Sequence, residues 1–122
     1  MKDDTLLLRQ IHPSFIQDGK VTSQAFSPTP KDDKKLSVYD GDLISPLESH
    51  AHFTSVLGFK SKGVLGVTVA ECNSLGVGSR PDPTPFPEHA VIDFEDFDNK
   101  EIKAKAKKLR TIAEQRDWSY QE

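Results

Sequence analysis

The chain has 122 residues, a formal net charge of −3 and 29% charged residues. A chain of this length buries roughly two thirds of its unfolded surface in one domain, so we expect residues 1–122 to form a single domain. Its mild acidity disfavours nucleic acid as a partner, because proteins that bind nucleic acids usually carry a basic surplus. Its one cysteine excludes an intrachain disulfide, and no apolar run has the length of a signal peptide or membrane span. We therefore expect a cytoplasmic protein with no membrane partner.

The first third of the chain predicts three strands. Residues 5–11 form an apolar run that contains one charge, Arg9, and the run ends before Pro13, which lacks a backbone donor. Residues 21–26 alternate between polar and apolar side chains, as a strand does. Residues 36–39 form a short third strand, preceded by a loop with two prolines and charges of both signs.

Three capping patterns predict helices. Ser45-Pro46-Leu47-Glu48 has the spacing of a capping box with proline at the first helical position, so a helix is expected to about residue 57. Thr68 to Glu71 repeats the spacing and predicts a short helix to residue 75. Asp98 to Glu101 begins the last helix, which residues 116–118 close before folding back. Its apolar stripe consists of Ile102, Ala106, Leu109 and Ala113.

The remaining segments are extended. Residues 64–68 are rich in β-branched side chains and predict a central strand. Residues 79–87 carry proline at every second position from 81, which predicts an extended arm without ladder hydrogen bonds. Residues 90–94 predict a strand with Ala90, Ile92 and Phe94 on one face. The fold class is therefore α+β, with a mixed or mostly antiparallel sheet of about five strands, two main helices and a short third, and helices on one face of the sheet.

The histidines, the cysteine and the basic residues of the last helix have structural interpretations. His50 and His52 lie two apart in a predicted helix, so they point about 200° away from each other and cannot share a metal ion; one is expected to be half-buried and the other solvated. The alternative is a metal site in which His12, His89 and Cys72 supply further ligands. We predict no metal. Cys72 is expected in the core rather than as a nucleophile. The basic side chains of the last helix spread around its circumference, as on a solvated face.

A set of polar residues in the predicted strands has no purely structural explanation. A charged Arg9 inside an apolar strand is costly unless it is paired, and Glu88 is the expected partner. If the strands are neighbours, these polar groups converge on one cleft, as in a ligand site. The alternative is that Arg9 faces solvent and the others are ordinary polar residues at strand ends. The candidate catalytic residues are Arg9, Ser37 and Glu88, and the candidate ligand-binding residues are His12, Ser23, Gln24 and His89.

The order of these elements resembles the three-part pattern of ADP-ribosyltransferase-like domains. In that pattern an arginine or histidine lies on the first strand, a serine on a later strand and a glutamate on a late strand. Arg9 or His12, Ser37 and Glu88 are the matching residues. The resemblance implies that the first two help to hold NAD and that the glutamate promotes attack on the ribose. We assign no family to the whole chain.

Two functions follow from these observations. The first is a protein-binding module without catalytic activity, an accessory or immunity-type partner of another protein. Its contact surface would be the proline arm, which is either a ligand for a peptide-reading domain or a connector anchored by Phe86, together with the acidic run. The alternative is an enzyme that uses a nucleotide or NAD, in which Arg9 holds a phosphate and Glu88 acts as base. Neither of these two functions assigns a resident cofactor to the protein. The predicted contact residues are Pro83, Pro85, Phe86, Asp93, Glu95, Asp96 and Asp98.

Overall fold

A computed structural model describes residues 1–122, except for the side chain of Pro30. The strands are β1 (Leu6–Gln10), β2 (Ile16–Gln17), β3 (Lys20–Val21), β4 (Lys35–Asp40), β5 (Gly63–Thr68), β6 (Gly78–Pro81), β7 (His89–Asp93) and β8 (Tyr120–Gln121). The helices are α1 (Pro46–Ala51), which continues as the π-helical turn η4 (His52–Val56), α2 (Val69–Ser74) and α3 (Asn99–Arg116). Three 3₁₀ turns complete the chain: η1 (Pro13–Phe15), η2 (Ser23–Phe26) and η3 (Pro30–Asp32).

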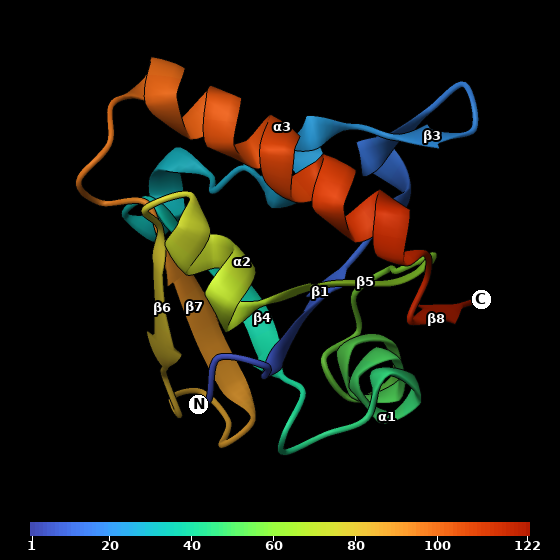
Figure 1. The fold of residues 1–122 in the computed structure, drawn as a ribbon. Helices are drawn as coiled ribbons and strands as arrows, with labels where there is room; N and C mark the ends of the chain where they lie inside the picture. The colour runs from blue at the N-terminus through green and yellow to red at the C-terminus, as the bar shows by residue number, and fades with distance from the viewer.

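The main sheet has six antiparallel strands in the order β6-β7-β4-β1-β5-β8, and β2 and β3 form a separate hairpin (Figure 1). The predicted α+β class is confirmed. The sheet has six strands instead of the five expected, because the strand predicted at residues 21–26 is not part of it and two edge strands join it. β6 pairs with β7, and β8 pairs with β5 after the chain turns at Asp117 (φ 74°). Within the described chain, every helix is too short or too polar to cross a bilayer.

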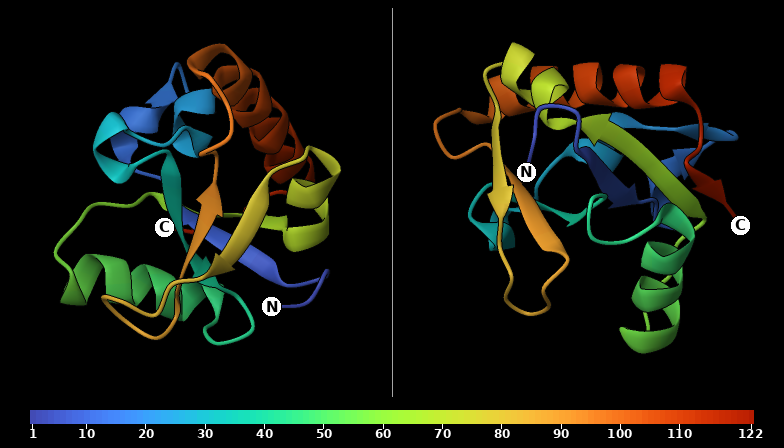
Figure 2. Two further views of the ribbon diagram at one scale, coloured as in Figure 1. Left: turned by 90° about the vertical axis from the view of Figure 1, so that its left-hand side faces the viewer. Right: turned by 60° about the horizontal axis from the view of Figure 1, so that its bottom comes forward.

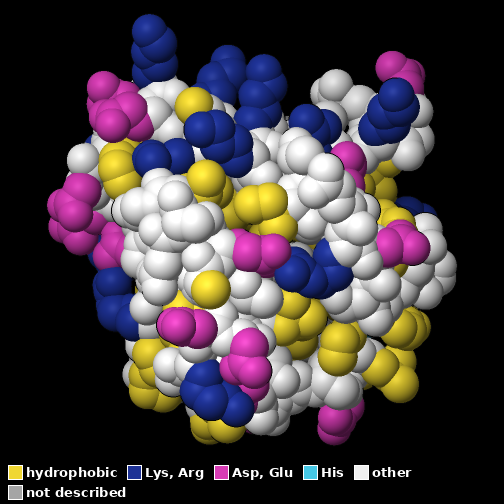
Figure 3. Space-filling model, viewed as in Figure 1, with side chains coloured by type: hydrophobic (Ala, Val, Ile, Leu, Met, Phe, Trp, Pro, Cys, Tyr) yellow, Lys and Arg dark blue, Asp and Glu magenta, His cyan; other side chains and the backbone are white. Residues whose placement is uncertain are grey.

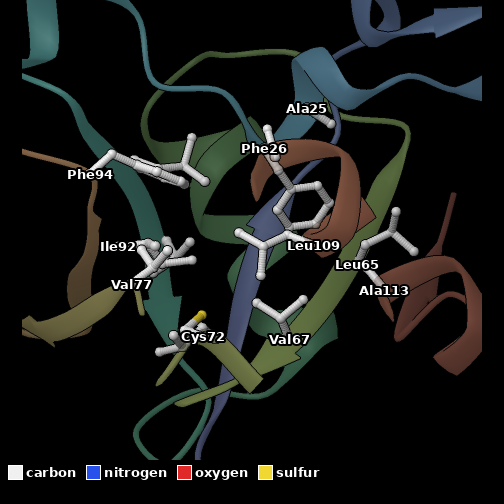
Figure 4. Packing of buried hydrophobic residues seen from close by; sticks show 14 of the residues in the cluster. Ala25, Phe26, Leu65, Val67, Cys72, Val77, Ile92, Phe94, Leu109 and Ala113 are labelled. Carbon is white, nitrogen blue, oxygen red and sulfur yellow. The ribbon is translucent and has the colours of Figure 1, made fainter. Parts of the chain in front are cut away.

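Alternation along the strands separates two apolar clusters. Leu7 belongs to the larger cluster and Leu8 to the smaller one, on opposite faces of the sheet. The larger cluster is covered by α3, whose predicted stripe of Ile102, Ala106, Leu109 and Ala113 is fully confirmed as buried. Figure 4 shows Leu109 packed beside Phe26 and above the strands. This face is the main core of the protein.

The expectation of helices on one face only is wrong. α3 and α2 cover one face, and α1 with η4 covers the other, with the sheet between them (Figure 2). A buried polar network joins α1 to the sheet: Gln10 Nε2 donates to Ser49 Oγ at 3.0 Å, and Ser61 Oγ donates to Gln10 Oε1 at 2.9 Å. Because the one leucine of α1, Leu47, is exposed, the sequence of α1 gives no sign of the face of the sheet that it covers.

The prediction of a strand over residues 21–26 is wrong. Only Lys20–Val21 pairs with another strand, whereas the segment that follows forms the turn η2. Ala25 N donates to Thr22 O at 3.2 Å, so the backbone is satisfied locally. Polar–apolar alternation over six residues therefore marked a turn that inserts Phe26 into the core.

The prediction of an arm without ladder bonds is wrong for its first part. β6 pairs with β7, with Ser79 opposite Ile92 and Arg80 opposite Val91. Pro81 is tolerated because β6 is an edge strand, where a missing donor on the outer side costs little. The other prolines of the arm lie in the loop between β6 and β7, and Phe86 anchors that loop as expected, being half-buried against Tyr39.

Two of the predicted capping boxes are complete. Thr68 and Glu71 cap α2, and Asp98 and Glu101 cap α3, with side chain and backbone bonded in both directions. Glu71 also receives two hydrogen bonds from Arg116, at 2.8 and 2.9 Å. Burial alone would raise the pKa of Glu71, but the bonds from Arg116 and Thr68 outweigh it and hold that pKa below its usual value.

This pair predicts a pH-dependent contribution to stability. A carboxylate whose pKa is lowered by folding stabilises the fold above its unfolded pKa of roughly 4.3, and the contribution is lost as the pH falls through the folded pKa. Glu71→Gln keeps an acceptor for Thr68 N and removes the charge, so it should cost about 1 kcal/mol or less at neutral pH, because the pair is partly exposed. Urea unfolding of both proteins from neutral to acid pH measures the cost, which should vanish at about pH 3.

Glu101→Gln is the matched control, because exposed Glu101 occupies the same capping position in α3. A Glu71→Gln cost that stays constant down to acid pH would show that the Arg116 pair does not set this dependence.

Candidate functional site

A cavity of about 270 Å³ opens between the sheet and η4, on the face away from α3. Its walls are mostly apolar and aromatic, and they come from β1, β4, η4 and the β6–β7 loop. Four polar residues, Arg9, Gln10, Ser37 and His89, lie among them. The lining consists of Leu8, Arg9, Gln10, Ser37, Val38, Tyr39, Phe53, Leu57, Phe59, Pro85, Phe86 and His89.

Arg9 reaches the cavity because the pairing of β1 with β4 ends before this residue. Their ladder covers only Leu7 opposite Asp40 and Leu8 opposite Tyr39. Beyond these pairs the half-buried side chain of Arg9 makes the hydrogen bonds to β4 and η2. Its Nε donates to Ala25 O at 2.7 Å, and its Nη1 donates to Ser37 O at 2.9 Å. Desolvation lowers the pKa of Arg9 to about 10, with Asp32 acting in the opposite direction. The side chain is therefore still charged at neutral pH. Its hydrogen-bond partners are the backbone carbonyls of Ala25 and Ser37, so the expected pairing with Glu88 is wrong.

Ser37 and His89 are diagonal neighbours on β4 and β7, because Ser37 lies opposite Val91 and Tyr39 lies opposite His89. Ser37 Oγ is 3.1 Å from His89 Nε2. On the far side of the ring, Nδ1 is 2.8 Å from Asp82 O and 3.6 Å from Asp82 Oδ2. Ser37 is an exposed residue, whereas His89 is only 9% exposed. The three residues thus form a chain that ends in the cavity.

An aromatic group forms one wall. Phe86 packs against Tyr39, His52 and His89, with ring centroids 4.6–5.3 Å apart. Tyr39 Oη lies 2.8 Å from His52 Nδ1. Desolvation and, less strongly, the nearby Glu88 carboxylate raise the pKa of Tyr39, so its hydroxyl stays protonated and can donate. This wall can pack against a planar or aliphatic group.

The structure brings together only part of the predicted cleft. Arg9, Ser37 and His89 line one cavity, whereas Glu88 stands next to Tyr39 outside the lining. His12 caps η1 and bonds to Ser14. Ser23 and Gln24 belong to η2, which packs under α3 on the other side of the sheet. These residues do not line the cavity.

The predicted partner-binding residues fall into two groups at opposite ends of β7. Pro83, Pro85 and Phe86 precede this strand, and Glu95, Asp96 and Asp98 follow it. Asp93, at the end of β7, pairs with Arg80 at 2.5 Å. The five residues of β7 span roughly 16 Å, so the two groups do not form one continuous patch. Only Pro85 and Phe86 belong to the cavity.

The residues considered for metal binding or nucleophilic chemistry have separate surroundings. His50 Nε2 lies 3.0 Å from Ser61 O, and His52 bonds to Tyr39, so the two histidines point to different partners. Among the described residues, no group of three His, Cys, Asp or Glu side chains is arranged to hold a metal ion. Cys72 is fully buried, and desolvation, with a smaller contribution from Glu71, raises the pKa of its thiol to about 12. It has the properties of a core residue.

Sequence reasoning missed the aromatic walls and Asp82. Phe53 and Leu57 are four apart in a predicted helix and so share a face, which was a usable signal. Asp82 could be found only from the β6–β7 pairing, in which Asp82 N donates to His89 O at 3.0 Å. The proline pattern obscured that pairing.

Comparison with known proteins gives no relative: no family model, no curated protein and no solved structure matches this chain. The function is therefore argued from the cavity itself.

Proposed function

We propose that this protein binds a small amphipathic molecule in the cavity between the sheet and η4. The observation that supports this function is a cavity of about 270 Å³ with aromatic walls and a few polar groups at one edge. Pockets for small molecules are generally apolar, with a few well-placed polar groups that fix the orientation of the ligand. The ligand would have an apolar body and one polar or anionic group.

The walls favour the apolar body. Leu8 belongs to the apolar cluster on this face of the sheet, and Phe53 and Phe86 pack against the same cluster. Burying an aromatic or aliphatic group against such side chains contributes about 25 cal/mol for each Å² removed from water. At the polar edge, Arg9 supplies positive charge, and Ser37 and His89 supply hydrogen-bonding groups.

The same lining weighs against a polyphosphate or dinucleotide. Arg9 is the one lysine or arginine of the lining, and two of its nitrogens already bond to backbone carbonyls. Charged phosphates would lose hydration against mostly apolar walls, which is unfavourable without paired cations. A single anionic group fits better than the NAD-like ligand that the element order suggested.

Titration with 1-anilinonaphthalene-8-sulfonate, an aromatic body with one anionic group, tests this function. At about 0.3 kcal/mol for each non-hydrogen atom, a probe of about 20 such atoms should bind with a dissociation constant on the order of 10–100 µM. Leu57 lines the cavity and is 37% exposed. Leu57→Glu should therefore weaken binding by about tenfold or more, because it removes apolar contact and brings a carboxylate to the wall.

Leu47→Glu is the control, because Leu47 lies in α1, is 57% exposed and is not part of the lining. It should bind the probe like the wild type. Thermal melts of all three proteins must show a cooperative transition, since partly unfolded chains also bind this probe. Equal loss of binding in both variants, or no saturable binding by the folded wild type, would contradict the proposal.

Protein binding is a second candidate function, supported by a concentration of exposed apolar side chains. Figure 3 shows hydrophobic side chains at the lower right, over the position of α1. Five of the large hydrophobic residues that are exposed lie between residues 43 and 59: Leu43, Leu47, Val56, Leu57 and Phe59. Clusters of this kind mark interaction sites. In this case a partner protein would insert one apolar side chain into the cavity across the rim formed by Leu57 and Phe59.

Affinity capture from the native lysate with wild type and variants tests the second candidate. Val56→Asp should release a stoichiometric partner, because Val56 is 71% exposed next to the rim. Lys107→Asp should retain the partner, because Lys107 is exposed on α3, which covers the other face of the sheet. A partner that binds both variants equally would not use this surface.

A further inference from the structure

The direction of the hydrogen bonds around His89 can be assigned from its partners. Asp82 O can only accept, so the 2.8 Å contact assigns the ring proton to Nδ1. Nε2 then carries the lone pair and accepts from the Ser37 hydroxyl at 3.1 Å. Asp82 Oδ2, at 3.6 Å from Nδ1, adds negative charge on the side where an imidazolium would need it. This is the order of roles in a serine nucleophile, its base and the orienting acid.

The serine is accessible from the cavity. Ser37 is exposed and belongs to the lining, while its base is buried beneath it. Leu8 and Phe86 line the same cavity, where an aliphatic or aromatic chain can lie. The guanidinium of Arg9 donates Nη1 to the backbone carbonyl of Ser37 at 2.9 Å, so the positive charge nearest to the nucleophile in the lining lies on its backbone.

We propose that Ser37 is a nucleophile that hydrolyses esters of small apolar carboxylic acids, with His89 as general base and Asp82 as the residue that positions it. The proposal rests on the proposed function, because the cavity must first bind the acyl group. Ester cleavage is the reaction class that combines an activated serine with an apolar acyl pocket and requires only water as a second reactant.

The steps balance with one water consumed. Ser37 Oγ attacks the ester carbonyl carbon, and its proton moves to His89 Nε2. The bond between that carbon and the alkoxy oxygen breaks, and His89 returns the proton to the leaving oxygen, which departs as an alcohol. Water then attacks the acyl carbon and gives a proton to His89. The bond to Ser37 Oγ breaks, Oγ recovers the proton, and the carboxylic acid leaves.

Labelling with an alkyl fluorophosphonate tests the nucleophile directly, because the reagent bonds to an activated serine with loss of fluoride. Intact-mass and peptide analysis should find one adduct, on Ser37. Ser37→Ala should abolish it. Ser55→Ala, at an exposed serine of η4 outside the lining, should leave it unchanged. His89→Gln should slow labelling by about 100-fold or more, the usual contribution of a general base.

Folding and binding controls separate the two proposals. Each variant is first checked for a cooperative melt and for binding of the naphthalene probe. If the wild type binds the probe and Ser37 is not labelled, the nucleophile is overturned and the binding function stands. If Ser37 is labelled equally fast in folded His89→Gln, the assigned base is overturned. If Ser37 is labelled but the probe does not bind, the reactivity of Ser37 stands, whereas the binding function fails and with it the apolar acyl pocket that ester hydrolysis requires.

Discussion

Replacing Leu109 with alanine is expected to lower the free energy of unfolding by about 2–5 kcal/mol. Leu109 is fully buried in the middle of α3, where its side chain packs beside Phe26 and above β1 and β5 (Figure 4). The truncation removes apolar contact and leaves a cavity that α3 cannot close without moving along its whole length. Urea unfolding, followed by circular dichroism, measures the loss.

Lys108→Ala is the adjacent control, since Lys108 is exposed on the same helix. It should change the stability by less than about 0.5 kcal/mol. If Leu109→Ala costs less than about 1 kcal/mol, α3 is not packed on the sheet as described, and the assignment of the main core to this face is wrong.

Gly63→Ala is expected to displace β8 from the sheet and to cost about 1–3 kcal/mol. A β carbon at Gly63 would lie 2.5 Å from Tyr120 O and 2.9 Å from Trp118 Cε3. The first contact is with backbone, so no change of side-chain rotamer can relieve it. The strand that pairs with Gly63 through Gln121 must therefore move. The fluorescence of Trp118, the single tryptophan, reports that movement.

Gly78→Ala provides the comparison, because a β carbon there meets no atom within 4 Å. It should leave the stability unchanged or raise it slightly, since alanine restricts the unfolded chain. Equal stability and equal Trp118 emission in the two variants would contradict the docking of β8 on β5.

Helices were predictable where a cap and a stripe agreed. Asp98 and Glu101 marked the start of α3, and the spacing of its apolar residues identified the buried face, because both signals depend on residues close in sequence. The strand predicted at residues 21–26 failed because six alternating residues also suit a turn whose hydrogen bonds are local. β8 was missed since its pairing depends on β5, far away in the chain.

The candidate site was predictable in part. Placing Arg9, Ser37 and His89 together required only that their strands be neighbours, and the sheet order β7-β4-β1 makes them so. The Arg9–Glu88 pair failed because backbone carbonyls satisfied the guanidinium, and such partners leave no mark in a sequence. Asp82 and the aromatic walls depend on the β6–β7 hairpin and on η4 packing against the sheet, which are tertiary features.

The most direct measurement is a methyl NMR titration of ¹³C-labelled leucines with the naphthalene probe. Leu8 and Leu57 line the cavity, whereas Leu7 and Leu109 lie in the core on the other face of the sheet. Binding in the cavity predicts saturable shifts of the Leu8 and Leu57 methyl signals, with those of Leu7 and Leu109 unchanged. Shifts confined to the leucines of the core face, or no saturable shift at Leu8, would contradict the assignment of this cavity as the binding site.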